Sequence, residues 1–491
     1  MAGGKRCLFG EFSPNQPNQC VYGLKKSLES FFDAAEVMKS IGQNGWIRLA
    51  TALIACAVAG HAQQPSNPPS HWRENIALGK QLLSKGLYQE AEKPLQAALA
   101  EIEKDTPVDY RLITSLNSLA DLHYEQGMYH EAEVLLRRAL EVGERVLGAD
   151  HLELAITLNS LGLVDAARGR FADAERFYRH SLAIVEHAFG PEHPEVAMRL
   201  DNLAELYREM GRYSEAEPLY RRELEVAERS VGPEHLQTAI SLNNLATLYR
   251  TKGAAGESEK LYRRALAIEE KILGPEHPQT AATLDNLAVL CGAAARQDEA
   301  LALARRALNI REKMLGPEHP DVARSLNTLA TLFYRRHWYG EAEPLLQRAL
   351  SVMEKSLGAD HSALVGVLNN LAVLYGSTRR YTDAEKALKR SLEIREKSGN
   401  NGQVRTAQKN LTDLYLISGQ FAEAEPRLSA WLEVSEKELA PNDPELAKGY
   451  RELAFTLRKL HRKSEAARSE ARANAILRDN KPRLGTRNQW K

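Results

Sequence analysis

This sequence has few cysteines, no net charge and few long apolar runs. Each of these features excludes some classes of protein function. Three of its 4 cysteines lie in the first 56 residues, where processing would remove or lipidate them. Cys291 alone would remain, so no intramolecular disulfide could form. Lys and Arg number 65, as do Asp and Glu, and this balance favours neither nucleic acid nor an anionic membrane as a partner.

Familiar catalytic motifs are lacking as well. The sequence contains no Walker loop, no Gly-x-Ser-x-Gly, no His-Glu-x-x-His and no Cys-x-x-Cys. Its carboxylates are spread along faces that we expect to be exposed, where burial cannot shift a pKa. We therefore predict no enzymatic activity, no cofactor and no metal. An enzyme with an unfamiliar site is the least favoured alternative.

Residues 38–62 form a candidate signal peptide. An apolar run at 49–60 follows Lys39 and Arg48, and it is shorter than the roughly 20 residues that span a bilayer. Cleavage after Ala62 satisfies the small-x-small rule. Residues 1–37 would then be an over-extended leader, with Met38 as the true initiator, and residues 63–70 would be a linker.

Two other interpretations of this segment stay open. Residues 53–56 resemble a lipobox, in which Cys56 would be acylated. An ordinary leader on a cytoplasmic protein is the second alternative. We expect export to the periplasm or the extracellular space, and no transmembrane segment in the mature chain.

The rest of the chain is an internal repeat. One leucine recurs every 42 residues, at Leu119, Leu161, Leu203, Leu245, Leu287, Leu329 and Leu371. Leu78 lies 41 residues earlier, Leu411 lies 40 residues after Leu371, and Leu453 follows after another 42. About ten units therefore fill residues 71–480, before a basic tail at 481–491.

Each unit predicts a helical hairpin. Leu242, Leu245, Ala246 and Tyr249 have the spacing of a core-facing helical stripe. A Gly-x-aromatic turn and a second periodic run follow, and that run usually ends in Leu-Gly, where we expect the glycine to adopt the left-handed conformation. A single hairpin has too little core to stand alone, so neighbouring hairpins must stack.

The motifs resemble a known family. Leu-Asn-Asn-Leu-Ala, Gly-x-Tyr-x-Glu-Ala-Glu, Tyr-Arg-Arg-Ala-Leu and Leu-Gly-Pro-Glu-His-Pro are similar to the 42-residue tetratricopeptide repeats (TPRs) of kinesin light chains and their bacterial relatives. The resemblance covers residues 71–480. It implies an all-α, right-handed α-solenoid whose first helices line a concave, peptide-binding groove. No long heptad segment for pairing with a motor subunit is evident, which argues against a motor-cargo adaptor.

Asparagine recurs in the middle of the first helices, where its helix propensity is poor. An Asn amide can donate and accept, as gripping a peptide backbone requires, and the resemblance implies the same role. The alternative is a ladder in which neighbouring repeats bond to one another, and both can hold. The predicted peptide-binding asparagines are Asn117, Asn159, Asn202, Asn243, Asn244, Asn286, Asn327, Asn369 and Asn370.

Arg208 and Arg250 should face the middle of the groove, with Tyr124 and Tyr334 nearer its ends. A cationic centre with aromatic edges would favour an acidic peptide that contains an aromatic residue, unless Glu205 and Glu209 neutralise the arginines.

A histidine also recurs every 42 residues, at His151, His193, His235, His277, His319 and His361. Stacked helices lie about 8 to 10 Å apart, too far for these side chains to share one zinc ion at about 2 Å. We predict that each histidine helps to close its own loop.

Two units break the pattern at the turn. Ala255 and Gln297 replace the turn aromatic, and Ser258 replaces a second-helix alanine. We predict a looser joint around residues 251–300.

The sequence thus predicts a non-enzymatic scaffold that binds peptides or proteins through an asparagine ladder. The main alternative is a self-assembling array in which the groove of one copy holds the tail of another. That alternative would make the protein a homo-oligomer.

Overall fold

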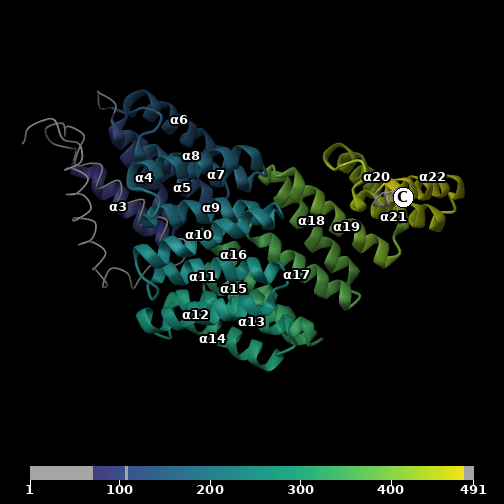
Figure 1. Ribbon diagram of the computed structural model, residues 1–491. Coiled ribbons are helices and arrows are strands. Elements are labelled where there is room, and N and C mark those ends of the chain that lie inside the picture. Colours follow the sequence, from purple (N-terminus) through teal and green to yellow (C-terminus); the bar gives the residue numbers. More distant parts are fainter. Residues whose placement is uncertain (1–69, 105–108, 480–491) are drawn as a thin grey trace, which may run out of the picture. The chain divides into compact units, whose positions relative to one another are not determined.

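The computed structural model describes residues 70–104 and 109–479. These residues form twenty α-helices and no β-strand, and successive helices pack as ten hairpins (Figure 1). The predicted all-α solenoid of about ten hairpins is confirmed. The predicted leader, signal peptide and basic tail, and the linker apart from Ser70, lie outside the described residues.

The hairpins have first helices of 14 to 18 residues and second helices of 15 to 19 residues. The first helices are α3 (Ser70–Ser84), α5 (Tyr110–Glu125), α7 (Leu152–Ala167), α9 (Pro194–Glu209), α11 (Leu236–Thr251), α13 (Pro278–Ala293), α15 (Pro320–Arg335), α17 (Leu364–Ser377), α19 (Asn401–Ser418) and α21 (Pro444–Lys459). The second helices are α4 (Tyr88–Ile102), α6 (Tyr129–Leu147), α8 (Phe171–Phe189), α10 (Tyr213–Ser230), α12 (Ala255–Leu273), α14 (Gln297–Leu315), α16 (Tyr339–Leu357), α18 (Tyr381–Ser398), α20 (Phe421–Glu438) and α22 (Lys463–Asp479).

The turn inside each hairpin needs a residue with positive φ. Gly127 has φ of 74° and Gly211 has φ of 72°, a region that glycine enters without a Cβ penalty. The aromatic residue two positions later begins the second helix, as at Tyr129 and Tyr213. Four non-glycine residues adopt a similar φ in the matching turns, namely Ala295, His337, Arg379 and His461.

The glycine at the end of the second helix differs from the prediction. Gly148 has φ 91° and ψ 153°, and Gly274 has φ 88° and ψ 162°. Their positive φ still requires glycine, but their ψ lies far from the roughly 47° of a left-handed helical residue. The chain therefore leaves the helix extended, because it must run on to the next first helix.

The repeated histidines close their own loops, as predicted. In all six, Nδ1 accepts a hydrogen bond from the backbone N–H two residues later, at 3.1 to 3.2 Å. In five of them this bond caps the following first helix. The histidine thus takes the place of the usual Ser, Asp or Asn cap.

The core consists of the predicted apolar stripe and the small residues beside it. Leu242, Leu245 and Ala246 are each at most 4% exposed. Full burial of a leucine side chain stabilises a fold by about 1.5–3 kcal/mol. Alanine at position 246 lets Tyr262 of the second helix pack close by.

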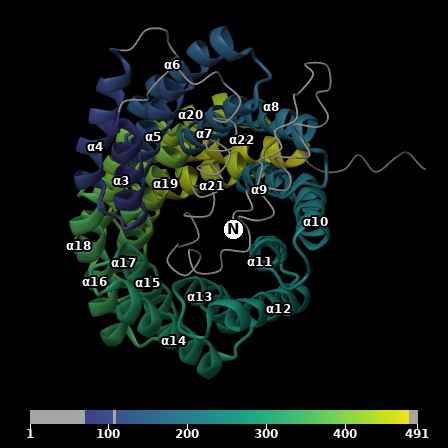
Figure 2. The same ribbon diagram turned by 90° about the vertical axis from the view of Figure 1, so that its left-hand side faces the viewer.

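The two helices of a hairpin occupy different layers. In Figure 2, the first helices α11, α13 and α15 lie on the inner side, and α10, α12 and α14 lie on the outer side. Residues on the first helices therefore form the inner face of the solenoid. Among residues 70–104 and 109–479, no helix has both the length and the apolarity that crossing a membrane would need.

Candidate functional site

Asparagines on neighbouring first helices bond directly to one another. The Nδ2 group of Asn202 donates to Oδ1 of Asn159 at 2.6 Å. Asn370 donates to Asn327 in the same way at 2.7 Å. Each bond joins one repeat to the next, so the structure contains the inter-repeat ladder of the alternative interpretation.

A second set of bonds follows a different register, 40 residues apart. The Nδ2 group of Asn117 donates to Thr157 Oγ1 at 3.0 Å. Asn243 donates to Thr283 at 2.6 Å. Because these partners also lie on adjacent first helices, the two registers together link α5 to α7, α7 to α9, α11 to α13 and α15 to α17.

The predicted peptide-binding residues fall into two groups by burial. Four of them are no more than 9% exposed, namely Asn117, Asn159, Asn202 and Asn243. The half-buried group contains Asn244, Asn286, Asn327, Asn369, Asn370, Arg208 and Arg250. The first group lies between helices, where it contributes to stacking, and its role in ligand contact stays a prediction. The second group is half-buried on the first helices, which form the inner face (Figure 2), and its role in ligand contact also stays a prediction.

A pair of carboxyl groups shares one asparagine amide. Asn244 Nδ2 donates to Asp201 Oδ1 at 2.8 Å and to Glu223 Oε1 at 3.3 Å. Burial raises the pKa of Asp201 to about 7, with a further contribution from Glu205. Burial and the neighbouring Asp201 also raise the pKa of Glu223. Asn244 is therefore held by the half-buried Asp201 and the fully buried Glu223, and it is less available to a ligand.

A third acid with a raised pKa, Glu269, follows on the next second helix, α12. Asn243 Nδ2 lies 3.4 Å from Glu269 Oε1, and burial raises the pKa of Glu269 to about 8. The expectation that the carboxylates lie on exposed faces, where burial cannot shift a pKa, is wrong for these three acids. Sequence reasoning missed Glu223 and Glu269. Glu223 was visible as a departure from the repeat, because Ser181, Ala265 and Ala307 occupy the same position in other units.

Asn286 differs from its counterparts on the inner face. Asn202, Asn244 and Asn370 occupy the matching position and each donate to the preceding first helix. The Asn286 side chain forms no hydrogen bond within residues 70–104 and 109–479, and the Oδ1 atom of the preceding Asn243 is buried without a partner there. Asn410, which sequence reasoning did not include, also forms none in that part of the chain. The series of hydrogen bonds between neighbouring first helices is thus interrupted at Asn286, and we call this the open position of the ladder.

The two predicted arginines differ in the same way. Arg208 Nε donates to Glu205 at 2.6 Å. Burial alone would raise the pKa of Glu205, but the hydrogen bond and charge of Arg208, together with the hydrogen bond from Tyr220, lower it overall. Glu205 thus neutralises Arg208, as the sequence allowed. Arg250 forms no ion pair with any described residue, and its Nε atom is buried without a partner among them. Arg250 is a half-buried cation on α11, the first helix that comes before the one carrying Asn286, α13.

The remaining reactive side chains do not gather on this face. Cys291 is a free, fully buried thiol whose pKa is raised by burial. No three His, Cys, Asp or Glu side chains in the described ranges are placed to hold a metal ion.

The comparison with protein families decides what kind of repeat this is. The tetratricopeptide repeat family matches in six overlapping segments, at residues 110–187, 161–229, 196–271, 238–313, 307–355 and 321–397. Together they span more than half of the chain.

The chain belongs to the tetratricopeptide repeat family.

The predicted resemblance to kinesin light chain-like TPRs is thereby confirmed at the level of the family. TPR proteins are typically interaction scaffolds without catalytic activity, and the match supports a protein-interaction scaffold for this chain. None of the curated proteins compared with the chain matches it.

Several solved structures are similar to this TPR protein. A kinesin light chain-like protein of Podosopora anserina with nearly identical TPR-like repeats is 27% identical, over 42% of this chain and 98% of its own, with a TM-score of 0.34. BtubC (BKLC) from P. vanneervenii is 25% identical, over 51% and 94%, with a TM-score of 0.37. A Rap protein complexed with Competence and Sporulation Factor is 14% identical, over 77% and 99%, with a TM-score of 0.51, a likeness of fold alone.

Proposed function

We propose that this TPR protein is a non-enzymatic scaffold that binds an extended peptide segment on its inner face, centred on Asn286 and Arg250. The open position of the ladder carries the proposal. At Asn286 an amide donor and acceptor are left without a partner among the described residues, on a face where the matching amides of Asn202, Asn244 and Asn370 are used. An amide of this kind can pair with the N–H and C=O of any peptide backbone.

Arg250 gives the proposed ligand its charge. An arginine without an ion pair favours a carboxylate, which its planar guanidinium can bind through two parallel hydrogen bonds. Glu205 removes Arg208 as a second cation, and the exposed Glu209 adds an opposing charge. We therefore propose a ligand with one acidic residue or a terminal carboxylate beside Arg250, and a weaker overall preference for acidic peptides than two unpaired arginines would give.

An array of decapeptides in which acidic residues are varied one position at a time tests this function. Peptides that bind wild-type protein are then measured by fluorescence anisotropy with Asn286→Ala and Arg250→Ala. One lost neutral hydrogen bond should weaken binding by about 2- to 13-fold. Arg250→Ala should weaken it by more, because bonds to charged groups contribute about 1.5–3 kcal/mol.

Asn309→Ala is the matched control, because Asn309 is an exposed asparagine on the second helix α14. It should bind like wild type. Equal affinity of wild type, Asn286→Ala and Arg250→Ala for every binding peptide would reject the inner face as the site. Binding that is unchanged when the acidic residue is replaced by its amide would reject the role of Arg250 alone.

The self-assembling array is the second candidate, and it rests on the basic composition of residues 481–491, which contain Lys481, Arg483, Arg487 and Lys491. Light scattering over a concentration series separates the two, because a strict monomer excludes assembly through the tail.

We also propose that the protein is exported, with residues 38–62 as its signal peptide. The short apolar run and the small residues before Gln63 support this proposal. N-terminal sequencing of the mature protein tests it. Gln63 as the first residue supports cleavage, acylated Cys56 supports the lipoprotein alternative, and an intact Met1 on cytosolic material rejects export.

A further inference from the structure

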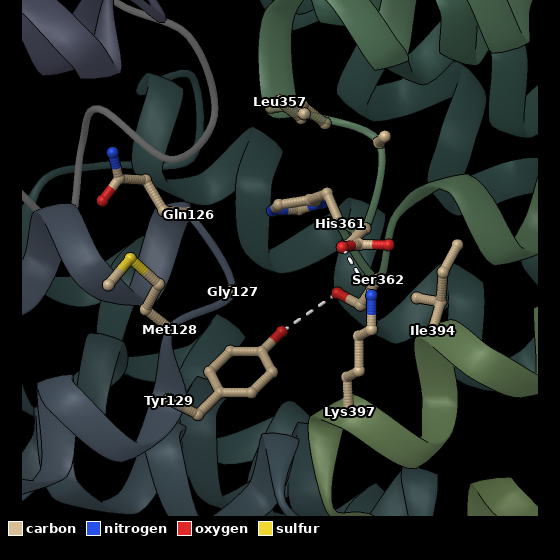
Figure 3. Close-up of a pocket in the computed structure, with 12 residues that line it drawn as sticks. Gln126, Gly127, Met128, Tyr129, Leu357, His361, Ser362, Ile394 and Lys397 are labelled. Carbon is tan, nitrogen blue, oxygen red and sulfur yellow. Dashed lines mark hydrogen bonds and ion pairs between the residues drawn. The ribbon is translucent and has the colours of Figure 1, made fainter.

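Two distant parts of the solenoid are joined by hydrogen bonds. Tyr129 Oη lies 3.0 Å from Ser362 Oγ, and His361 Nε2 lies 2.8 Å from the backbone carbonyl of Glu125. Asn400 Nδ2 donates to the carbonyl of Ala167 at 3.2 Å. Partners in these bonds are 233 to 236 residues apart in sequence. Figure 3 shows the Tyr129 and Ser362 side chains directed toward each other.

The acceptors explain why these bonds form. Glu125 and Ala167 are the last residues of α5 and α7. The final carbonyls of a helix have no partner within it and carry a partial negative charge. His361 and Asn400 supply N–H donors to them. The cavity between the α5–α6 turn and the α16–α17 loop measures about 360 Å³, and the ion pair of Asp360 and Lys397 lies on its wall.

Two residues that make these contacts, Ser362 and Asn400, lie where the sequence departs from its own repeat pattern. Ser362 follows the loop histidine, a place that leucine or proline holds in the units of His151, His193, His235, His277 and His319. Asn400 lies in the loop where the repeat shortens from 42 to 40 residues. It is 3% exposed and also caps α19 by accepting from Gln403 N–H at 3.1 Å. Both departures thus provide a contact with a distant repeat.

The turns that accept these contacts and the loops that face them follow the same order along the chain. A Cβ added to Gly86, Gly127 or Gly169 would lie 3.9, 3.6 or 2.7 Å from Pro320, His361 or Asn400, respectively. Three consecutive turns therefore face three consecutive loops. At Gly211 and Gly253, the next two turns, an added Cβ would meet nothing within 4 Å.

We propose that Tyr129, Ser362, His361 and Asn400 form a latch that fixes the superhelical pitch of the repeats between α7 and α16, and that the solenoid extends when the latch opens. Pitch in a solenoid is the sum of small rotations between adjacent repeats. Joining repeat two to repeat eight, and repeat three to repeat nine, fixes that sum. Three net hydrogen bonds are weak enough for the latch to open reversibly. The inner face of the enclosed repeats changes its spacing when this happens.

A triple variant tests the latch against a matched control. Tyr129→Phe, His361→Ala and Asn400→Ala remove the cross-turn bonds together with two helix-start contacts. Tyr213→Phe, His235→Ala and Asp443→Ala remove the equivalent tyrosine hydroxyl and two equivalent helix caps at positions that form no cross-turn hydrogen bond within residues 70–104 and 109–479. The latch variant should show a larger radius of gyration in small-angle X-ray scattering. It should also show faster hydrogen exchange at both 123–129 and 357–363, by about two- to tenfold for each lost bond.

The control triple should match wild type in radius of gyration and in exchange at both segments. Equal values for the latch and control triples would overturn the proposal. If the latch triple does not fold, the cycle of Tyr129→Phe and Ser362→Ala replaces it, because each change removes one hydroxyl. Non-additive effects on exchange at 123–129 support the latch, and strictly additive effects overturn it.

Discussion

Ser258 donates a hydrogen bond from its buried hydroxyl to the backbone carbonyl of Ala246, 2.7 Å away. The serine that replaces alanine in the fifth repeat is therefore satisfied, and it does not by itself loosen the joint around residues 251–300. The loss that remains is the turn aromatic. Ala255 is exposed where Tyr213 packs against the core of its own unit.

Restoring that aromatic should tighten the joint. Ala255→Tyr is expected to slow hydrogen exchange in α12 and to stabilise the protein by about 1 kcal/mol, since an aromatic ring recovers apolar burial. Hydrogen exchange by mass spectrometry measures this. In wild type, exchange across 251–300 should be faster than in the flanking repeats, and uniform protection would refute the looser joint.

Replacing an asparagine of the ladder with alanine should lower the free energy of unfolding, whereas replacing a surface asparagine should not. Asn202→Ala removes the donor to Asn159 and leaves a buried oxygen unpaired, which costs about 1–3 kcal/mol. Asn309→Ala, on an exposed face, should stay within about 0.5 kcal/mol of wild type. Urea denaturation followed by circular dichroism compares the two. Equal midpoints would mean that the ladder does not contribute to stacking.

The raised pKa of Glu269 predicts that the free energy of unfolding falls as the pH rises. Its pKa is raised from 4.5 to about 8 by burial. Its contribution is therefore complete below about pH 4.5 and is lost as the pH rises toward 8. Glu269→Gln keeps the size and hydrogen bonding of the protonated acid. The variant should melt like wild type at pH 4.5 and be more stable at pH 8.5, by on the order of 5 kcal/mol. An equal difference at both pH values would contradict this.

Alanine substitutions at two turn glycines, compared with each other, separate the effect of backbone strain on stability from the effect of the cross-turn contact. Gly169 and Gly211 have nearly the same φ, 74° and 72°. Alanine at either position carries a left-handed penalty of about 1–2 kcal/mol. At 169 the new Cβ would also lie 2.7 Å from Asn400 Oδ1, whereas at 211 it meets nothing within 4 Å. Gly169→Ala should therefore lower the melting temperature further than Gly211→Ala, as calorimetry would measure.

Local features of the fold were predictable because they repeat. The spacing of Leu245 and its counterparts places every first helix, and the recurrence of His277 places the loops that precede six of them. The pairing of Arg208 with Glu205 was also foreseeable, because side chains three residues apart lie on one helix face. These features depend on neighbours within one or two turns of helix.

Other features could not be predicted, because they depend on sums over many units. The sequence showed recurrent asparagines, but it did not show that Asn202 is bonded while Asn286 is open, since this depends on small differences in helix spacing. The contact of His361 with Glu125 depends on rotations accumulated over six repeats. An error of a few degrees at each junction would separate these residues.

The offset between turns and loops has an evolutionary consequence. Solenoids commonly gain or lose units by duplication, since each unit contacts only its neighbours. Here a unit inserted between Ala167 and His361 would carry all three donors past their acceptors and break every bond of the set at once. We therefore expect the number of repeats in this interval to vary less among relatives than the number outside it.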